Sequence, residues 1–107
     1  MKNKKAYIYS RISPLADHEI LTYQEKILNQ LALDLDYDIA YQSYSISYSL
    51  LETESLLNEI ISIIQGELVD ALIIWSPIRI TVSKDLYEEI EMLCEMHHIQ
   101  IISYKNN

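Results

Sequence analysis

The chain has 107 residues, of which 50% are hydrophobic and 22% charged, a composition typical of a single globular domain and not of a disordered chain. Sixteen acidic and eight basic residues give a formal net charge of -8, so DNA would be repelled unless the few cations gather on one face. The apolar runs are far shorter than the ~20 residues that span a bilayer, and the single cysteine, Cys94, excludes an internal disulfide. We therefore expect a cytoplasmic protein without a membrane segment, in which Cys94 is a buried thiol.

The N-terminal third predicts a strand followed by a helix. Residues 5–12 alternate in character and are rich in β-formers, which predicts a strand that ends before Pro14. Apolar residues recur at helical spacing over residues 21–35, which predicts an amphipathic helix. Thr22 is the expected cap of this helix, and Glu25, three residues later, would complete a capping box.

The middle third predicts a second strand, a loop and a second helix. Residues 37–44 look extended, whereas the Ser/Tyr run over 43–49 has no helical period and is expected to be a mobile loop. Residues 52–65 carry leucines and isoleucines at helical spacing. Gly66 follows directly, where a left-handed C-terminal cap would stand.

The C-terminal third predicts a strand, a helix and a last strand, over residues 69–75, 83–97 and 99–104. The first of these strands is almost entirely apolar, as expected for a central strand covered on both faces of a parallel sheet. The alternating order of strands and helices predicts an α/β fold, a three-layer α/β/α sandwich with a mostly parallel sheet. In such sheets function concentrates in the loops beyond the carboxyl ends of the strands, here residues 10–17, 44–50 and 76–83.

Two of these loops carry a recognisable pattern. Residues 9–13 read Tyr-Ser-Arg-Ile-Ser at the end of the first strand, and Gln24 stands in the helix that follows. The third predicted strand has the lead-in 66–70 and is followed by residues 75–83, Trp-Ser-Pro-Ile-Arg-Ile-Thr-Val-Ser. Together these motifs resemble the catalytic domain of the serine recombinases of the resolvase/invertase type. The resemblance extends over essentially all of residues 1–107.

The resemblance implies a set of roles. Ser13 would be the nucleophile that attacks a DNA phosphate and forms a 5'-phosphoserine link, without metal or nucleotide cofactor. Arg11 and Arg79 would bind the phosphate, and Gln24 would be an orienting hydrogen-bond donor. Such a set fits the physics of phosphoryl transfer, where positioning and charge stabilisation supply most of the rate and a serine alone is a weak nucleophile.

The sequence also departs from the family pattern. Ile78 stands where the family has an aspartate and Val82 where it has an arginine, and residues 49–52 offer no cation and add the negative charge of Glu52. Loss of one transition-state donor costs about 2.7 to 4 kcal/mol, so two losses predict little activity for the chain alone. We also expect residues 1–107 to form one catalytic-domain core, without the oligomerisation helix and the DNA-binding domain of the family.

Two functions from different classes remain open at this point. The first is a serine site-specific recombinase domain, degenerate and nearly silent alone, with weak or indirect contact to DNA. The second is a non-catalytic recombinase-like module that pairs with and modulates an intact recombinase or another protein, as a homo- or hetero-oligomer. A receiver-like or flavodoxin-like domain is disfavoured, because Trp75 and Ser76 stand where a receiver carries its phosphoacceptor carboxylate.

Other suggestive residues have simpler interpretations. His97 and His98 close a predicted helix, but neighbouring residues on a helix point apart, and no cysteine or histidine cluster accompanies them, so a metal site is not expected. Tyrosines could stack on bases, but stacking surfaces normally accompany basic grooves. We instead expect Tyr7, Tyr9, Tyr41 and Tyr44 to fill the faces of the sheet.

Overall fold

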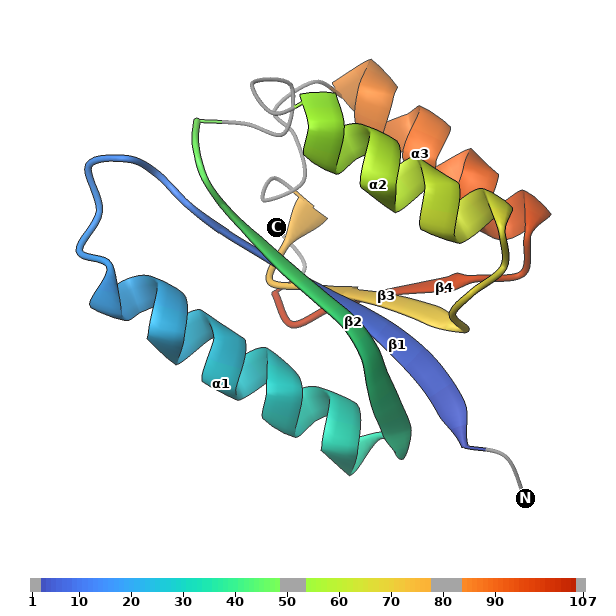
Figure 1. The fold of residues 1–107 in the computed structure, drawn as a ribbon, viewed down its shortest axis with the longest axis horizontal. Helices are drawn as coiled ribbons and strands as arrows, with labels where there is room; N and C mark the ends of the chain where they lie inside the picture. Colours follow the sequence, from blue (N-terminus) through green and yellow to red (C-terminus); the bar gives the residue numbers. More distant parts are fainter. Residues whose placement is uncertain (1–2, 49–53, 78–83, 106–107) are drawn as a thin grey trace.

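The computed structural model describes residues 3–48, 54–77 and 84–105. In these segments strands and helices alternate along the chain (Figure 1). The elements are β1 (Lys4–Ile12), α1 (Glu19–Asp34), β2 (Tyr37–Ile46), α2 (Glu54–Gln65), β3 (Ala71–Ile74), α3 (Lys84–Met96) and β4 (Gln100–Ser103). The predicted order of elements is confirmed.

The four strands form one parallel sheet in the order β2-β1-β3-β4. Helix α1 covers one face of the sheet, and α2 and α3 lie side by side on the other (Figure 1). The expected three-layer α/β/α sandwich is therefore confirmed, with β3 inside the sheet as predicted. The chain runs from β1 outward to β2 and then returns to the far side of β1, so the order of strands reverses between β1 and β3. Ligand sites of open α/β sheets lie at such a reversal, beyond the carboxyl ends of the strands.

Two apolar layers hold the sandwich together, and β1 contributes to both because its side chains alternate between the faces of the sheet. Tyr7 and Tyr9 pack against α2 and α3, whereas Ala6 and Ile8 pack against α1. Cys94 of α3 lies in the first layer and is buried, as predicted. None of the helices in the described segments is long and apolar enough to cross a membrane.

The start of α1 differs from the prediction. The helix begins at Glu19, so Thr22 lies within its first turn and does not cap it. Instead the side chain of Asp17 accepts a hydrogen bond from the Glu19 N–H (2.9 Å). A cap must precede the first helical residue to receive its free N–H groups, and Asp17 is the residue that does so here.

The end of α2 also differs. Gly66 does not adopt a positive φ; Glu67 does, with φ 53°. The N–H of Glu67 bonds to the carbonyl of Ile64 (3.0 Å) and that of Leu68 to the carbonyl of Ile63 (3.2 Å), the paired bonds of a Schellman motif. A Cβ at position 66 would lie 3.2 Å from the Ser62 carbonyl oxygen, so the glycine serves a close approach and not a left-handed backbone.

The Ser/Tyr run is only partly the loop that was expected. Strand β2 continues to Ile46, which pairs with Ile12 of β1. Along the end of this strand serines face inward and larger residues outward: Ser45 is buried and Tyr44 exposed. Because the inward-facing residues are polar and the outward-facing ones larger, hydrophobic alternation does not reveal this part of the strand. The prediction that Tyr41 and Tyr44 fill the sheet faces is therefore wrong, while it is confirmed for the buried Tyr7 and Tyr9.

Candidate active site at the carboxyl edge of the sheet

Buried polar side chains gather at one edge of the sheet. Six polar residues are buried in the described segments, and all belong to the carboxyl ends of β1, β2 and β3 or to the helix beside them: Ser10, Arg11, Gln24, Ser45, Ser47 and Ser76. Burying polar groups costs free energy unless they are hydrogen-bonded, so a packed core rarely concentrates them without a reason. This edge is also where the order of strands reverses, and we take it as the candidate site.

Arg11 lies in β1, on the face of the sheet covered by α2 and α3. Only 6% of it is exposed, and it is the only buried cation among the described residues. Its Nη1 donates a hydrogen bond to the carbonyl oxygen of Ser47, just beyond β2. A guanidinium remains protonated in proteins, so this contact holds a permanent positive charge at the end of the central strand.

Gln24 fixes the main chain at the same point. Its Oε1 accepts a hydrogen bond from the Arg11 N–H (3.0 Å), and its Nε2 donates one to the Arg11 carbonyl (3.2 Å). Strand β3 pairs with β1 only as far as Tyr9, opposite Ile74. Beyond that pair, the side-chain amide of Gln24 provides the donor and the acceptor that a further residue of β3 would have provided.

Ser13 is the first residue after β1 and is partly exposed, in contrast to the buried residues before it. Its carbonyl accepts a hydrogen bond from the Ala16 N–H (3.1 Å), which closes the turn that contains Pro14. The Ser13 hydroxyl is therefore presented at the rim of the edge, two residues after the buried charge of Arg11. A hydroxyl at the end of a strand that also carries a fixed cation is a candidate for attack on an anionic phosphate group.

Arg79 lies outside the described residues, as do Ile78, Val82 and residues 49–52. The structure does describe the residues between β3 and Pro77. Ser76 is buried there, and the pairing of β1 with β3 brings it to the same edge of the sheet as the end of β1.

Sequence reasoning missed the buried serines of β2 and its end, which lie at this edge beside the predicted Tyr9. The Ser45 and Ser47 hydroxyls lie 2.6 Å apart, beside the carbonyl that binds Arg11. Burial raises the pKa of Tyr9 to about 12, although the neighbouring Ser45 and the charge of Arg11 act in the opposite direction. The strict alternation of serine with larger residues over 43–48 is the signal that could have identified these serines as inward-facing.

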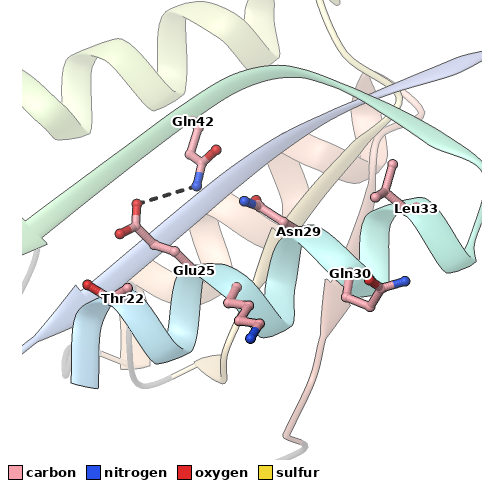
Figure 2. A pocket seen from close by; sticks show the side chains of 7 residues that line it. Thr22, Glu25, Asn29, Gln30, Leu33 and Gln42 are labelled. Atoms are coloured by element: carbon pink, nitrogen blue, oxygen red, sulfur yellow. Dashed lines mark hydrogen bonds between the residues drawn. The ribbon is translucent and has the colours of Figure 1, made fainter. Parts of the chain in front are cut away.

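A separate groove lies along α1 and must be distinguished from this edge. Figure 2 shows it between α1 and β2, where Gln42 Nε2 donates a hydrogen bond to Glu25 Oε2 (3.3 Å). Its volume is about 440 Å³, and its lining is Thr22, Glu25, Lys26, Asn29, Gln30, Leu33 and Gln42. Neither Ser13 nor any of the six buried polar residues at the sheet edge lines this groove, so it is not part of the candidate site.

His97, just after α3, contacts a carboxylate in the turn after α2. The His97 Nδ1 lies 3.2 Å from Glu67 Oε1, an exposed ion pair when the imidazole is protonated. Within residues 3–48, 54–77 and 84–105, no three His, Cys, Asp or Glu side chains are grouped so that they could hold a metal ion.

The fold is similar to solved structures of serine recombinases. The C-terminal catalytic domain of ISC1926 TnpA, an IS607-like serine recombinase, is 26% identical, with a TM-score of 0.85 over 96% of this chain and 72% of that one. A serine recombinase from Sulfolobus solfataricus is 21% identical (TM-score 0.76; 99% of this chain, 71% of that one). The N-terminal catalytic domain of TP901-1 integrase is 19% identical (TM-score 0.78; 94% and 76%). No protein-family model matches the sequence, and neither does any curated protein.

Proposed function

We propose that this chain, which has the fold of the serine recombinase catalytic domains, acts on DNA through Ser13 with a reduced set of catalytic cations. One observation carries the proposal: a partly exposed serine stands at the carboxyl end of the central strand, two residues after the buried Arg11, whose main chain is held by Gln24. These are the residues that the sequence motif singles out. The place is also the reversal point where α/β sheets carry their sites.

The proposed reaction is a phosphoryl transfer. The Ser13 Oγ attacks the phosphorus of a DNA phosphodiester, and the bond from phosphorus to the 3' oxygen breaks. The 5' phosphate is then linked to the serine, and the hydroxyl proton ends on the released 3' oxygen. Reversal of the same step with another 3' hydroxyl rejoins the strands, so neither a metal nor a nucleotide is consumed.

Each remaining residue has a separate role in the proposal. Arg11 and Arg79 balance the negative charge that the phosphate acquires in the transition state. A guanidinium has five N–H donors, enough to hold the Ser47 carbonyl and a phosphate oxygen together. Gln24 is a positioning residue: it holds the main chain of Arg11 and so fixes where the guanidinium and the following serine stand.

The proposed activity is low. Val82 and residues 49–52 leave two expected cations absent from the sequence, and each loss reduces the rate by roughly 100- to 1,000-fold. The net charge of -8 further weakens attraction to DNA. These same features favour the second candidate, a catalytically silent recombinase-like module that pairs with an intact recombinase or another protein.

The test is formation of a covalent DNA adduct. The chain is incubated with labelled DNA that carries the site of an intact recombinase, alone and together with that recombinase, and adducts are separated on denaturing gels. We expect a slowly formed adduct with the mass of this chain that disappears in Ser13→Ala. Ser62→Ala is the control, because Ser62 is exposed on α2, outside the candidate site, and its loss should leave the adduct in place.

The two candidates give different results in this assay. Absence of any adduct, together with inhibition of the intact recombinase that survives Ser13→Ala, would refute the catalytic proposal and favour the binding module. An adduct that persists in Ser13→Ala would show that another residue is the nucleophile.

A further inference from the structure

Residues of both α2 and α3 line one apolar groove. Both helices lie on the same face of the sheet (Figure 1), where buried residues such as Ile60 and Ile90 anchor them. The groove has a volume of about 290 Å³ and is lined by Ile61, Gln65, Leu86, Glu89, Ile90 and Leu93. Four of these six side chains are aliphatic, so the floor of the groove is apolar and in contact with water.

One lip of the groove is acidic and carries exposed methionines. Asp85, Glu89, Met92 and Met96 follow one another at spacings of four, three and four residues, which places them on one stripe of α3. All four are exposed, with Met92 at 55% and Met96 at 71%. Methionine side chains are flexible and polarisable and suit surfaces that adapt to an apolar partner.

Helix α3 is strongly acidic. It carries five exposed carboxylates, Asp85, Glu88, Glu89, Glu91 and Glu95, and one lysine at its first residue, Lys84. The groove side of α2 contributes the neutral Gln65. A partner that fills the groove and matches this charge must therefore be basic along the edge that lies over α3.

We propose that the α2/α3 groove is a docking site for a basic amphipathic helix of another protein. A helix that lays apolar residues spaced three and four apart into such a groove is a common mode of recognition, and flanking Lys or Arg residues would face the lip formed by Asp85 and Glu89. A second copy of this chain does not fit, because it carries a net charge of -8 and each of the three helices in the described segments holds at most one lysine. The proposal is independent of catalysis, since neither Ser13 nor Arg11 lines the groove.

The test uses a labelled 18-residue helical peptide of leucine, lysine and alanine, with leucines spaced three and four apart and lysines on both flanks. Binding to the full chain is followed by fluorescence anisotropy. We expect a Kd below about 100 µM, and weaker binding as salt rises from 0.1 to 1 M, because the Debye length falls from about 10 to about 3 Å. Amide resonances of α2 and α3 should shift, and those of β2 should not. A peptide with glutamates in place of the lysines should not bind.

Two charge reversals separate a docked helix from general attraction to an acidic protein. Glu89→Lys, on the groove lip, should weaken binding at least about five-fold. Glu91→Lys changes the net charge equally but lies about 200° around the helix from Glu89, and it should weaken binding less than about two-fold. Ile61→Ala, checked for folding by circular dichroism, should weaken binding about three- to ten-fold through lost apolar contact.

Several outcomes would overturn the proposal. These are failure of the lysine peptide to bind, equal binding of the glutamate peptide, equal effects of Glu89→Lys and Glu91→Lys, or resonance shifts outside α2 and α3. If Ile61→Ala does not fold, the pair of charge reversals still decides the question. Every one of these results is separate from adduct formation at Ser13, so either proposal can fail without the other.

Discussion

Replacement of Gln24 by leucine tests the description of the strand end most directly. The substitution keeps a side chain of similar size in a position that is only 2% exposed. It removes both hydrogen bonds to the main chain of Arg11, at 3.0 and 3.2 Å. Strand β3 does not reach this level of β1, so it supplies no substitute for the lost partners.

The size of the effect follows from those two bonds. Each buried main-chain group that loses its partner costs roughly 1–3 kcal/mol, and the gain in apolar contact from leucine offsets only part of this. We expect Gln24→Leu to lower the free energy of unfolding by about 2–4 kcal/mol. For a domain of this size about 1 kcal/mol corresponds to roughly 4–8 °C, so the melting temperature should fall by at least about 8 °C.

Thermal and urea unfolding followed by circular dichroism measure this change. The matched control is Gln30→Leu on the same helix, where the side chain is exposed and bonds only to Asp34 (2.8 Å). That control should stay within about 0.5 kcal/mol of the parent protein. A Gln24→Leu protein that melts within 2 °C of Gln30→Leu, a threshold of about 0.5 kcal/mol, would refute the role assigned to Gln24.

Three further predictions concern other parts of the molecule. Burial raises the pKa of Tyr9 to about 12, so between about pH 10 and 12 the unfolded chain loses this proton while the native protein keeps it. The free energy of unfolding is therefore unaffected below pH 10 and falls within this window by up to about 1.4 kcal/mol per pH unit. Urea titrations of Tyr9→Phe should show a smaller slope, and an unchanged slope would contradict the prediction. His98 has φ 59°, a left-handed conformation that glycine adopts without strain, so His98→Gly should raise the free energy of unfolding by about 1 kcal/mol. Glu95→Gly, inside α3, should lower it by a similar amount. Melting temperatures that change in the same direction would be inconsistent with backbone strain at His98. Cys94 is 1% exposed and burial raises its pKa to about 11, so a thiol reagent at pH 8 should react only after unfolding, and rapid labelling of the native protein would disprove the burial.

The arrangement of elements was predictable because hydrophobic periodicity is a local property. The apolar run that contains β3 indicates burial on both faces wherever its neighbours lie, and the helical spacing over α2 and α3 identifies their inner sides. The alternation of strands and helices then leaves few ways to build the sandwich. Ser13 and Arg11 could be placed at the end of the first strand for the same reason.

The errors concern features whose cause lies elsewhere in the chain. Residues 43–46 belong to a strand because β1, more than thirty residues away, pairs with them. The Ser43 hydroxyl faces inward, where it accepts a hydrogen bond from the Tyr7 hydroxyl. At Gly66 an added Cβ would also lie 3.3 Å from Leu68 Cγ, a contact that depends on how the chain turns after α2 and not on the helical pattern. No local pattern contains this information.

The sequence by itself determined the layers, the order of the elements and the position of the candidate nucleophile along the chain, since these depend on composition and spacing over a few turns or strands. Only the tertiary structure decided that Gln24 bonds to the main chain of Arg11, and that the Arg11 guanidinium reaches across to Ser47. Hydrogen bonds of this kind join groups on different elements, and they form only once apolar packing has brought the carboxyl ends of the strands together.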